Sequence, residues 1–316
     1  MIPYAGSVNP GPLMFERMGG QRFDYTNGDG PEDSTHPLRE HHQVLTGDPD
    51  LTWPSSCIEM GDEFLNGSQD FSGSGLPSGG ARQEMVVTQH WSFTGSVVNQ
   101  AWGTCPFDKD AIQYAQVDAG AIDEVGSLSH WIDSLYMYDA TGTQYGMKYA
   151  LALLDPTSRD DFAFLNDNGL VPDEFADRPL DWNATGAQKI IVLMTDGNIS
   201  HQYRPHDPYD VANVYQVGIT TAIPGVMSQR NQRYRRRLDL NKSAGGVDFL
   251  AMCNMAKEPS RNVQIYTVAF ETGTVGRDQM SRCATSPAHF FETSGTDLIS
   301  VFEAIAGEVT ALRVVQ

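Results

Sequence analysis

Residues 189–197, which read KIIVLMTDG, decide the fold of this chain. The five apolar residues from Ile190 to Met194 form a continuous run that begins with β-branched side chains and is too short for a helix. Such a run predicts a central strand that is buried on both faces of a sheet. Residues 262–270 (NVQIYTVAF) predict a second buried strand, and residues 289–293 (HFFET) predict a short third one.

Helical patterns surround these strands. Residues 121–137 (AIDEVGSLSHWIDSLYM) place apolar side chains at three- and four-residue steps, which predicts an amphipathic helix. Residues 141–156 (TGTQYGMKYALALLDP) predict a second helix that stops at the proline, and residues 249–257 and 297–312 predict two more. Strands that alternate with helices favour an α/β fold with a mainly parallel, doubly wound (Rossmann-like) sheet and helices on both faces.

Two stretches of the chain do not follow this alternation. Residues 20–117 are rich in turn-forming residues, above all at 26–37 (TNGDGPEDSTHP) and 66–80 (NGSQDFSGSGLPSGG). Segments of this kind usually decorate a domain and do not form its core. We therefore interpret the 316 residues as a single domain that carries two long loop insertions, at 20–117 and at 198–245.

The charge balance narrows the classes of partner. The chain has 21 Lys and Arg residues against 40 Asp and Glu residues, a formal net charge of −19. A nucleic-acid-binding surface needs a clustered basic field, so this balance argues against nucleic acid as a partner. The sequence has no run of about 18 apolar residues, the length that predicts a membrane-spanning helix. It also lacks the short motifs of common hydrolases and nucleotide-binding enzymes, although a triad assembled in space stays open.

Four cysteines occur in the chain, and none belongs to a CxxC pair that would indicate a structural zinc site. Two lie in the N-terminal third and two in the C-terminal quarter, which suits the disulfides Cys57–Cys105 and Cys253–Cys283. Two disulfides would indicate an oxidising compartment. Four buried free thiols remain the alternative, because connectivity cannot be derived from sequence alone.

Polar residues follow the first predicted strand at the edge where ligands of parallel sheets bind. Asp196, with Gly197 behind it, is well placed to hold a hard cation directly or through water. Thr143, at the start of a predicted helix, could supply a hydroxyl oxygen to the same place. The alternative is that Thr143 caps its helix and Asp196 satisfies a turn. If the cation site exists, Thr195, Gly197 and Asn198 lie around it and could face a partner.

Several motifs resemble a known family in their order along the chain. VLMTDGN, VQIYTVAFE and SRCATSPAHFFET, followed by the last helix, resemble a von Willebrand factor A domain. More narrowly, MIPYAGSVNPG, TGTQYGMKYALALLDP, KIIVLMTDGN and CATSPAHFFE look like the TadG-type proteins of bacterial Tad/Flp pilus assembly. The resemblance implies a metal-ion-dependent adhesion site (MIDAS) in which Asp196 and Thr143 are ligands. The cation would be Mg²⁺, with Mn²⁺ or Ca²⁺ as alternatives.

The chain departs from that family at its beginning. The family places a DxSxS motif after an opening strand, and this sequence resembles a domain that lacks its first strand and helix. A DxSxS occurs at residues 70–74 (DFSGS), but it lies in a Gly- and Ser-rich loop and is better explained as coincidence. We therefore expect the cation site to be incomplete. By resemblance, the intact protein would carry an N-terminal membrane anchor and expose this domain outside the cytoplasm, in the periplasm or at the cell surface.

Two main functional hypotheses follow, besides a less favoured one, a hydrolase whose site cannot be assembled from the sequence. The first is a non-enzymatic adhesion module of a TadG-like protein, in pilus assembly or surface attachment, that binds other pilus or envelope proteins through the cation site. The second is a structural module of the cell envelope whose cation site is vestigial and free of metal. Under the second hypothesis, Asp196→Ala would leave partner binding unchanged.

Overall fold

The computed structural model describes residues 1–21, 56–58, 82–83, 105–115, 120–136, 138, 140–205, 236–240 and 242–315. The predicted insertions at 20–117 and 198–245 fall largely outside these residues, and the DFSGS sequence at 70–74 falls outside them entirely.

Three parallel strands form the central sheet. β3 (Ile190–Thr195) pairs with β6 (Gln264–Phe270), and β6 pairs with β7 (Phe290–Thr293), so that β6 is central. The register places Ile190 opposite Gln264, and Thr267 opposite Phe290. All three strands lie where the sequence predicts them, and the parallel α/β sheet is confirmed.

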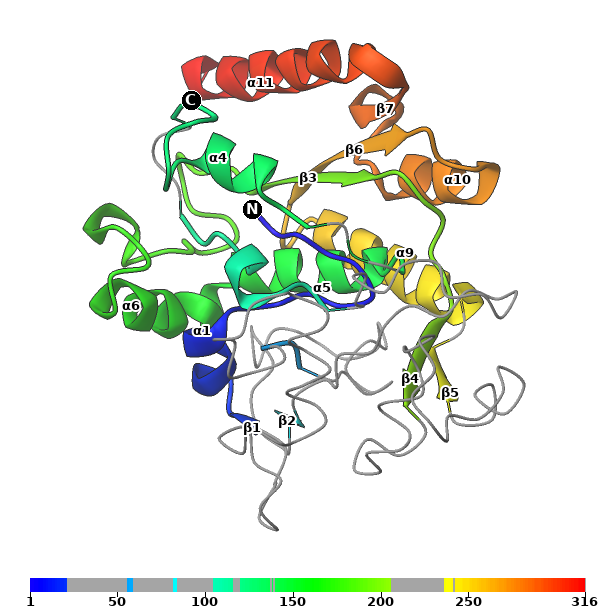
Figure 1. The fold of residues 1–316 in the computed structure, drawn as a ribbon. Coiled ribbons are helices and arrows are strands. Elements are labelled where there is room, and N and C mark those ends of the chain that lie inside the picture. The colour runs from blue at the N-terminus through cyan, green and yellow to red at the C-terminus, as the bar shows by residue number, and fades with distance from the viewer. Residues whose placement is uncertain are drawn as a thin grey trace, which may run out of the picture.

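Helices cover both faces of this sheet (Figure 1). On one face, α5 (Thr143–Leu154), α9 (Lys242–Lys257) and α10 (Thr274–Cys283) pack against alternate residues of β3 and β6 in one large hydrophobic core. On the other face, α11 (Leu298–Val315) covers Tyr266 and Val268 of β6 through Ile305. The doubly wound arrangement follows from β6, whose five inner residues are all buried.

The remaining described α-helices and strands are short. They are α1 (Pro12–Arg17), α4 (Leu128–Asp133), α6 (Arg159–Asp167), the parallel pair β1 (Gly20–Gln21) and β2 (Arg82–Gln83), and the antiparallel pair β4 (Gln202–Pro205) and β5 (Arg236–Leu240).

The helix predicted over residues 121–137 is wrong in its extent, because only α4 forms within it. Gly126 has φ 94°, a left-handed conformation that ends any helix before it, and Ser127 then caps α4 by accepting a hydrogen bond from His130 N at 3.0 Å. The apolar side chains Ile122 and Val125 are consequently exposed. The apolar residues have helical spacing, but the left-handed conformation of Gly126 interrupts the helix.

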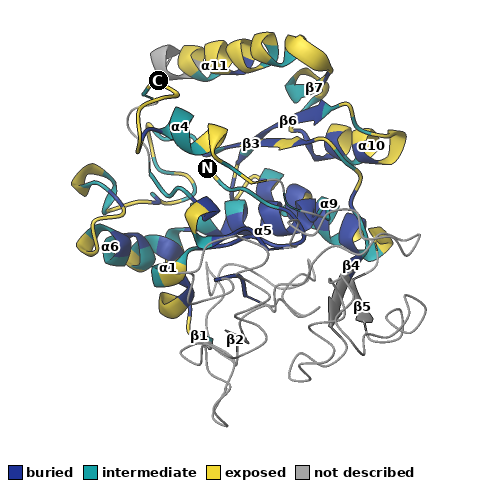
Figure 2. Ribbon diagram, viewed as in Figure 1, coloured by how far each residue is buried: buried dark blue, intermediate teal, exposed yellow. Residues whose placement is uncertain are grey.

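The prediction that residues 189–197 contain a strand buried on both faces is also corrected. β3 lies at the edge of the described sheet, and only Ile191, Leu193 and Thr195 are buried. On the other face, Val192 is 43% and Met194 is 37% exposed. On this face α11 packs over β6 and β7 (Figure 2), and Ile190 of β3 joins the same hydrophobic cluster.

Both predicted disulfides are present. Cys57 and Cys105 are joined with their Cα atoms 6.1 Å apart, and Cys253 and Cys283 with theirs 5.1 Å apart. All four cysteines are fully buried. The second disulfide joins the C-terminal part of α9 to the end of α10, so it links two helices that pack on the same face of β6. The alternative of four free thiols is excluded.

Candidate functional site

The carboxyl end of β3 carries the first group of predicted site residues. Thr195 is buried and Asp196 is exposed, because the alternation of the strand continues one residue beyond its end. Gly197 N donates to Thr195 Oγ1 at 3.3 Å, which turns the chain sharply away from the sheet. Asn198 Oδ1 then accepts a hydrogen bond from Gly276 N at 2.6 Å, so this side chain fastens the loop to the first turn of α10.

Thr143, the second predicted ligand, begins α5. The capping residue of this helix is Gly142, which has no side chain, so Thr143 does not cap its helix as the alternative interpretation required. Thr143 is only 2% exposed, and no described group has good hydrogen-bond geometry to its Oγ1 atom, although the Tyr4 hydroxyl is close enough for Thr143 to lower the pKa of that phenol. A buried hydroxyl without a partner is costly, and such groups call for an explanation in a native structure.

The loops that carry Asp196 and Thr143 lie against each other. Ser200 N donates to Thr141 O at 3.0 Å, and Thr141 N donates to Ser200 Oγ at 2.9 Å. A Cβ atom added to Gly197 would lie 2.8 Å from Thr141 Oγ1, so only glycine allows this close approach. The structure therefore brings together the two loops that the sequence analysis assigned to one site.

Tyr4 is a residue of this site that the sequence analysis missed. Its hydroxyl donates to Met194 O at 2.5 Å. The pKa of Tyr4 is raised to about 12, mainly by burial; hydrogen bonding with the Thr195 and Thr143 hydroxyls opposes the rise, and the charge of Asp196 adds to it. The phenol is therefore neutral at physiological pH and close to both predicted ligands. No motif or periodicity in the sequence connects a tyrosine near the N-terminus with this strand.

The donor set suits a hard cation but is small. It consists of one carboxylate, from Asp196, and one unpartnered hydroxyl, from Thr143. The described residues contain no group of three or more His, Cys, Asp or Glu side chains that could hold a metal ion. Mg²⁺ keeps several of its waters and is commonly held by one or two carboxylates, so two protein oxygens can hold it weakly.

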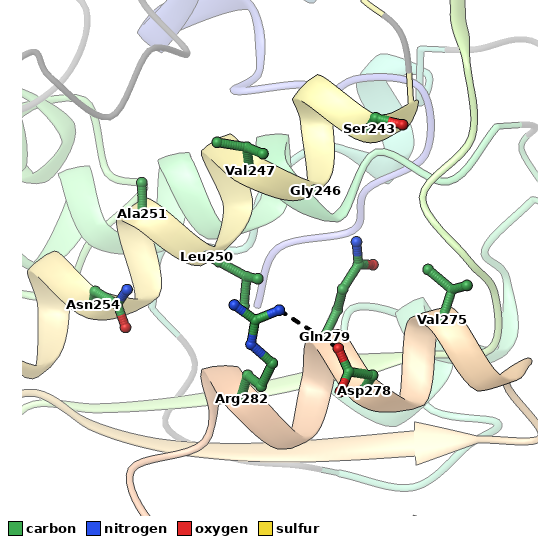
Figure 3. Close-up of a pocket in the computed structure, with 10 residues that line it drawn as sticks. All are labelled: Ser243, Gly246, Val247, Leu250, Ala251, Asn254, Val275, Asp278, Gln279 and Arg282. Carbon is green, nitrogen blue, oxygen red and sulfur yellow. Dashed lines mark ion pairs between the residues drawn. The ribbon is translucent and has the colours of Figure 1, made fainter.

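A groove runs between α9 and α10 beside this site (Figure 3). It encloses about 440 Å³, and its walls are mainly apolar, with Val247 and Val275 exposed at its mouth. Arg282 and Asp278 of α10 form an ion pair of 3.5 Å within it. Gly276, which holds Asn198, adjoins Val275, so the groove ends close to the loop that carries Asp196.

Comparisons with known proteins give no family match and a distant structural likeness. No family model and no curated protein matches the sequence. A similar solved structure is the vWF domain of the type V pili tip protein Mfa5 from Porphyromonas gingivalis, at 15% identity and a TM-score of 0.31, covering 58% of this chain and 72% of that one. A likeness this distant carries no argument. The class of this protein therefore rests on its own fold, an α/β domain with a parallel sheet and two disulfides.

Among the described residues, no helix is both long and apolar enough to cross a membrane.

Proposed function

We propose that this chain is a non-enzymatic binding module that recognises a protein partner through a weak cation site at the carboxyl end of β3. The observation that carries the proposal is the pairing of an exposed carboxylate, Asp196, with a buried and unpartnered hydroxyl, Thr143 Oγ1, on two loops that hydrogen-bond to each other. Ligands of parallel α/β sheets bind at this edge, where loops from different strands converge.

In this proposal, Asp196 binds the cation directly or through water, and Thr143 contributes its hydroxyl oxygen. Mg²⁺ is the favoured ion, with Mn²⁺ or Ca²⁺ as alternatives, because carboxylate, hydroxyl and water are ligands of hard cations. The bound cation would supply an open coordination position for a carboxylate of the partner. Thr195, Gly197 and Asn198 shape the loop around Asp196, and the groove between α9 and α10 extends the surface that a partner would meet.

The wider role that we propose is the one implied by the sequence motifs, a TadG-like module in pilus assembly or surface attachment, anchored to a membrane in the intact protein. Two fully buried disulfides support a location outside the cytoplasm, because such bonds persist in oxidising compartments. The net charge of −19 favours protein partners over nucleic acid.

The test is a titration of the whole chain with Mn²⁺, followed by electron paramagnetic resonance, and with Mg²⁺, followed by calorimetry. We expect a dissociation constant on the order of 1 mM, typical of weak extracellular sites, and its loss in Asp196→Asn. Asp167→Asn is the matched control, since Asp167 is an exposed carboxylate at the end of α6. Equal binding by Asp196→Asn and the unmodified protein would disprove the site.

The alternative function is a structural envelope module that binds no metal. The observation in its favour is the small donor set, since no three potential metal-binding side chains of the types His, Cys, Asp and Glu gather within the described ranges. If the unmodified protein binds neither cation, this alternative replaces the first proposal.

A further inference from the structure

The N-terminal segment lies directly over the start of α5. A Cβ atom added to Gly142 would lie 2.4 Å from Ala5 O, and one added to Gly146 would lie 2.7 Å from Tyr4 Cδ1. Real Cβ atoms do not come this close, so these two glycines leave room for the segment that contains Tyr4 and Ala5. Because Gly142 and Gly146 flank Thr143 in the first turn of α5, the segment closes over the proposed ligand.

The Tyr4 hydroxyl fastens this segment to the sheet. It donates to Met194 O, on the β3 edge that no described strand covers. Tyr4 also lies close enough to Thr143, Thr195 and Asp196 for all three to influence its pKa. Thr143 Oγ1 is inaccessible to solvent, whereas Asp196, two residues beyond Met194, is exposed. A cation can therefore reach Asp196 freely, but it reaches Thr143 only if the segment moves.

We propose that Tyr4 is the gate of the cation site: its phenol holds the N-terminal segment closed over Thr143, and cation binding requires that this contact opens. The inference rests on the cation site proposed above. In the closed state, the phenol competes with the cation for the space between Thr143 and the end of β3. Cation binding and release of Tyr4 are then linked equilibria, so that each favours the other by the same factor.

The linkage predicts that weakening the closed contact tightens cation binding. Tyr4→Phe removes the hydrogen bond to Met194 O but keeps the ring. An ordinary hydrogen bond makes a roughly fivefold difference in an equilibrium, so we expect Tyr4→Phe to bind Mn²⁺ about fivefold more tightly. Gly146→Ala should act in the same direction, because the added methyl group displaces the ring, and alanine also favours the helix.

The matched control is Tyr114→Phe. Tyr114 is likewise a tyrosine whose hydroxyl donates to a backbone carbonyl, that of Pro10 at 2.6 Å, but it packs against Phe162 of α6. Its substitution should leave the Mn²⁺ affinity unchanged. A second readout is the ultraviolet difference spectrum on Mg²⁺ addition, in which the unmodified protein and Tyr114→Phe should show one tyrosine becoming exposed and Tyr4→Phe should not.

The possible outcomes distinguish failure of the proposed gate from failure of the proposed cation site. Tighter binding by both Tyr4→Phe and Gly146→Ala, with Tyr114→Phe unchanged, supports the gate. Unchanged affinity in both variants overturns the gate but leaves an Asp196-dependent site intact. Weaker binding by Tyr4→Phe also overturns it, because the phenol would then be a ligand. If no variant binds either cation, the proposed site itself fails, and the gate fails with it. Gly146→Ala keeps the test decisive if Tyr4→Phe does not fold.

Discussion

Two buried glutamines close to the start of α5 differ in how their amides are hydrogen-bonded. Gln144 and Gln202 are both fully buried. The Gln202 amide donates to Thr141 O at 3.3 Å and to Ser200 O at 3.2 Å, which fastens the loop around the candidate site. The Gln144 amide makes no hydrogen bond through either its oxygen or its nitrogen, and it packs against Gly245 of α9. The two glutamines should therefore respond oppositely to an apolar replacement.

We expect Gln144→Met to raise the free energy of unfolding by about 1 kcal/mol, because it removes two unsatisfied polar atoms at nearly constant volume. Gln202→Met should lower it by about 1 kcal/mol, because Thr141 O and Ser200 O each lose a donor, which outweighs the removal of Gln202 Oε1, an atom without a partner. Urea denaturation of both variants measures the difference. Destabilisation of equal size in the two variants would show that the Gln144 amide has a partner in solution.

At the scale of the secondary-structure elements, the sequence predicts the sheet better than it predicts what covers it. β3 has a more apolar sequence than β6, yet β6 is buried on both faces and β3 on one. The composition of a strand indicates how strongly it tends to be buried. Which strands are covered depends on where α11 packs, and this is determined by the tertiary structure. The same limit applies to α4, where the φ of Gly126 overrode a helical spacing, and to Tyr4, which no local pattern connects to β3. The loops of Asp196 and Thr143 were predictable, because strand ends of a parallel sheet converge.

The two faces of the sheet give a direct test of the β3 correction. Val192→Thr should change the free energy of unfolding by less than about 0.5 kcal/mol, because Val192 is 43% exposed. Val268→Thr is the matched substitution in the buried centre of β6, where a hydroxyl replaces a methyl group, and it should cost about 2 kcal/mol. Thermal denaturation of both variants measures these changes. A large loss in Val192→Thr would mean that this face of β3 is covered in solution.

At the scale of the whole molecule, the stability of the domain should depend on pH through a buried lysine. Lys148 is 3% exposed, and burial lowers its pKa from 10.5 to about 7, although the charge of Asp248 partly opposes the shift. Between these two pH values the unfolded chain binds more protons at this position than the folded chain does. The free energy of unfolding therefore rises as the pH increases from about 7 towards 10.5.

The expected rise is at most about 1.4 kcal/mol per pH unit from this one group. Lys148→Met should make the free energy of unfolding depend less on pH between about 7.5 and about 9, a range that lies between the two pKa values. The same substitution should stabilise the protein at neutral pH. Lys242→Met, at an exposed lysine that begins α9, should leave the slope unchanged. Urea denaturation across this pH range measures the slope, and an unaltered slope in Lys148→Met would contradict the prediction.

The disulfide between Cys57 and Cys105 has a consequence for how this protein could be engineered. Both cysteines are fully buried beside Phe107. Asn9 Nδ2 donates to Pro106 O at 2.8 Å, so the residue next to Cys105 is hydrogen-bonded to the N-terminal part of the domain. The polypeptide between the two cysteines begins and ends at one fixed point. The entropy of a closed loop grows only logarithmically with its length. The sequence separation of 48 between the two cysteines can consequently be lengthened, for example by an epitope or an affinity tag, at a small cost in loop entropy.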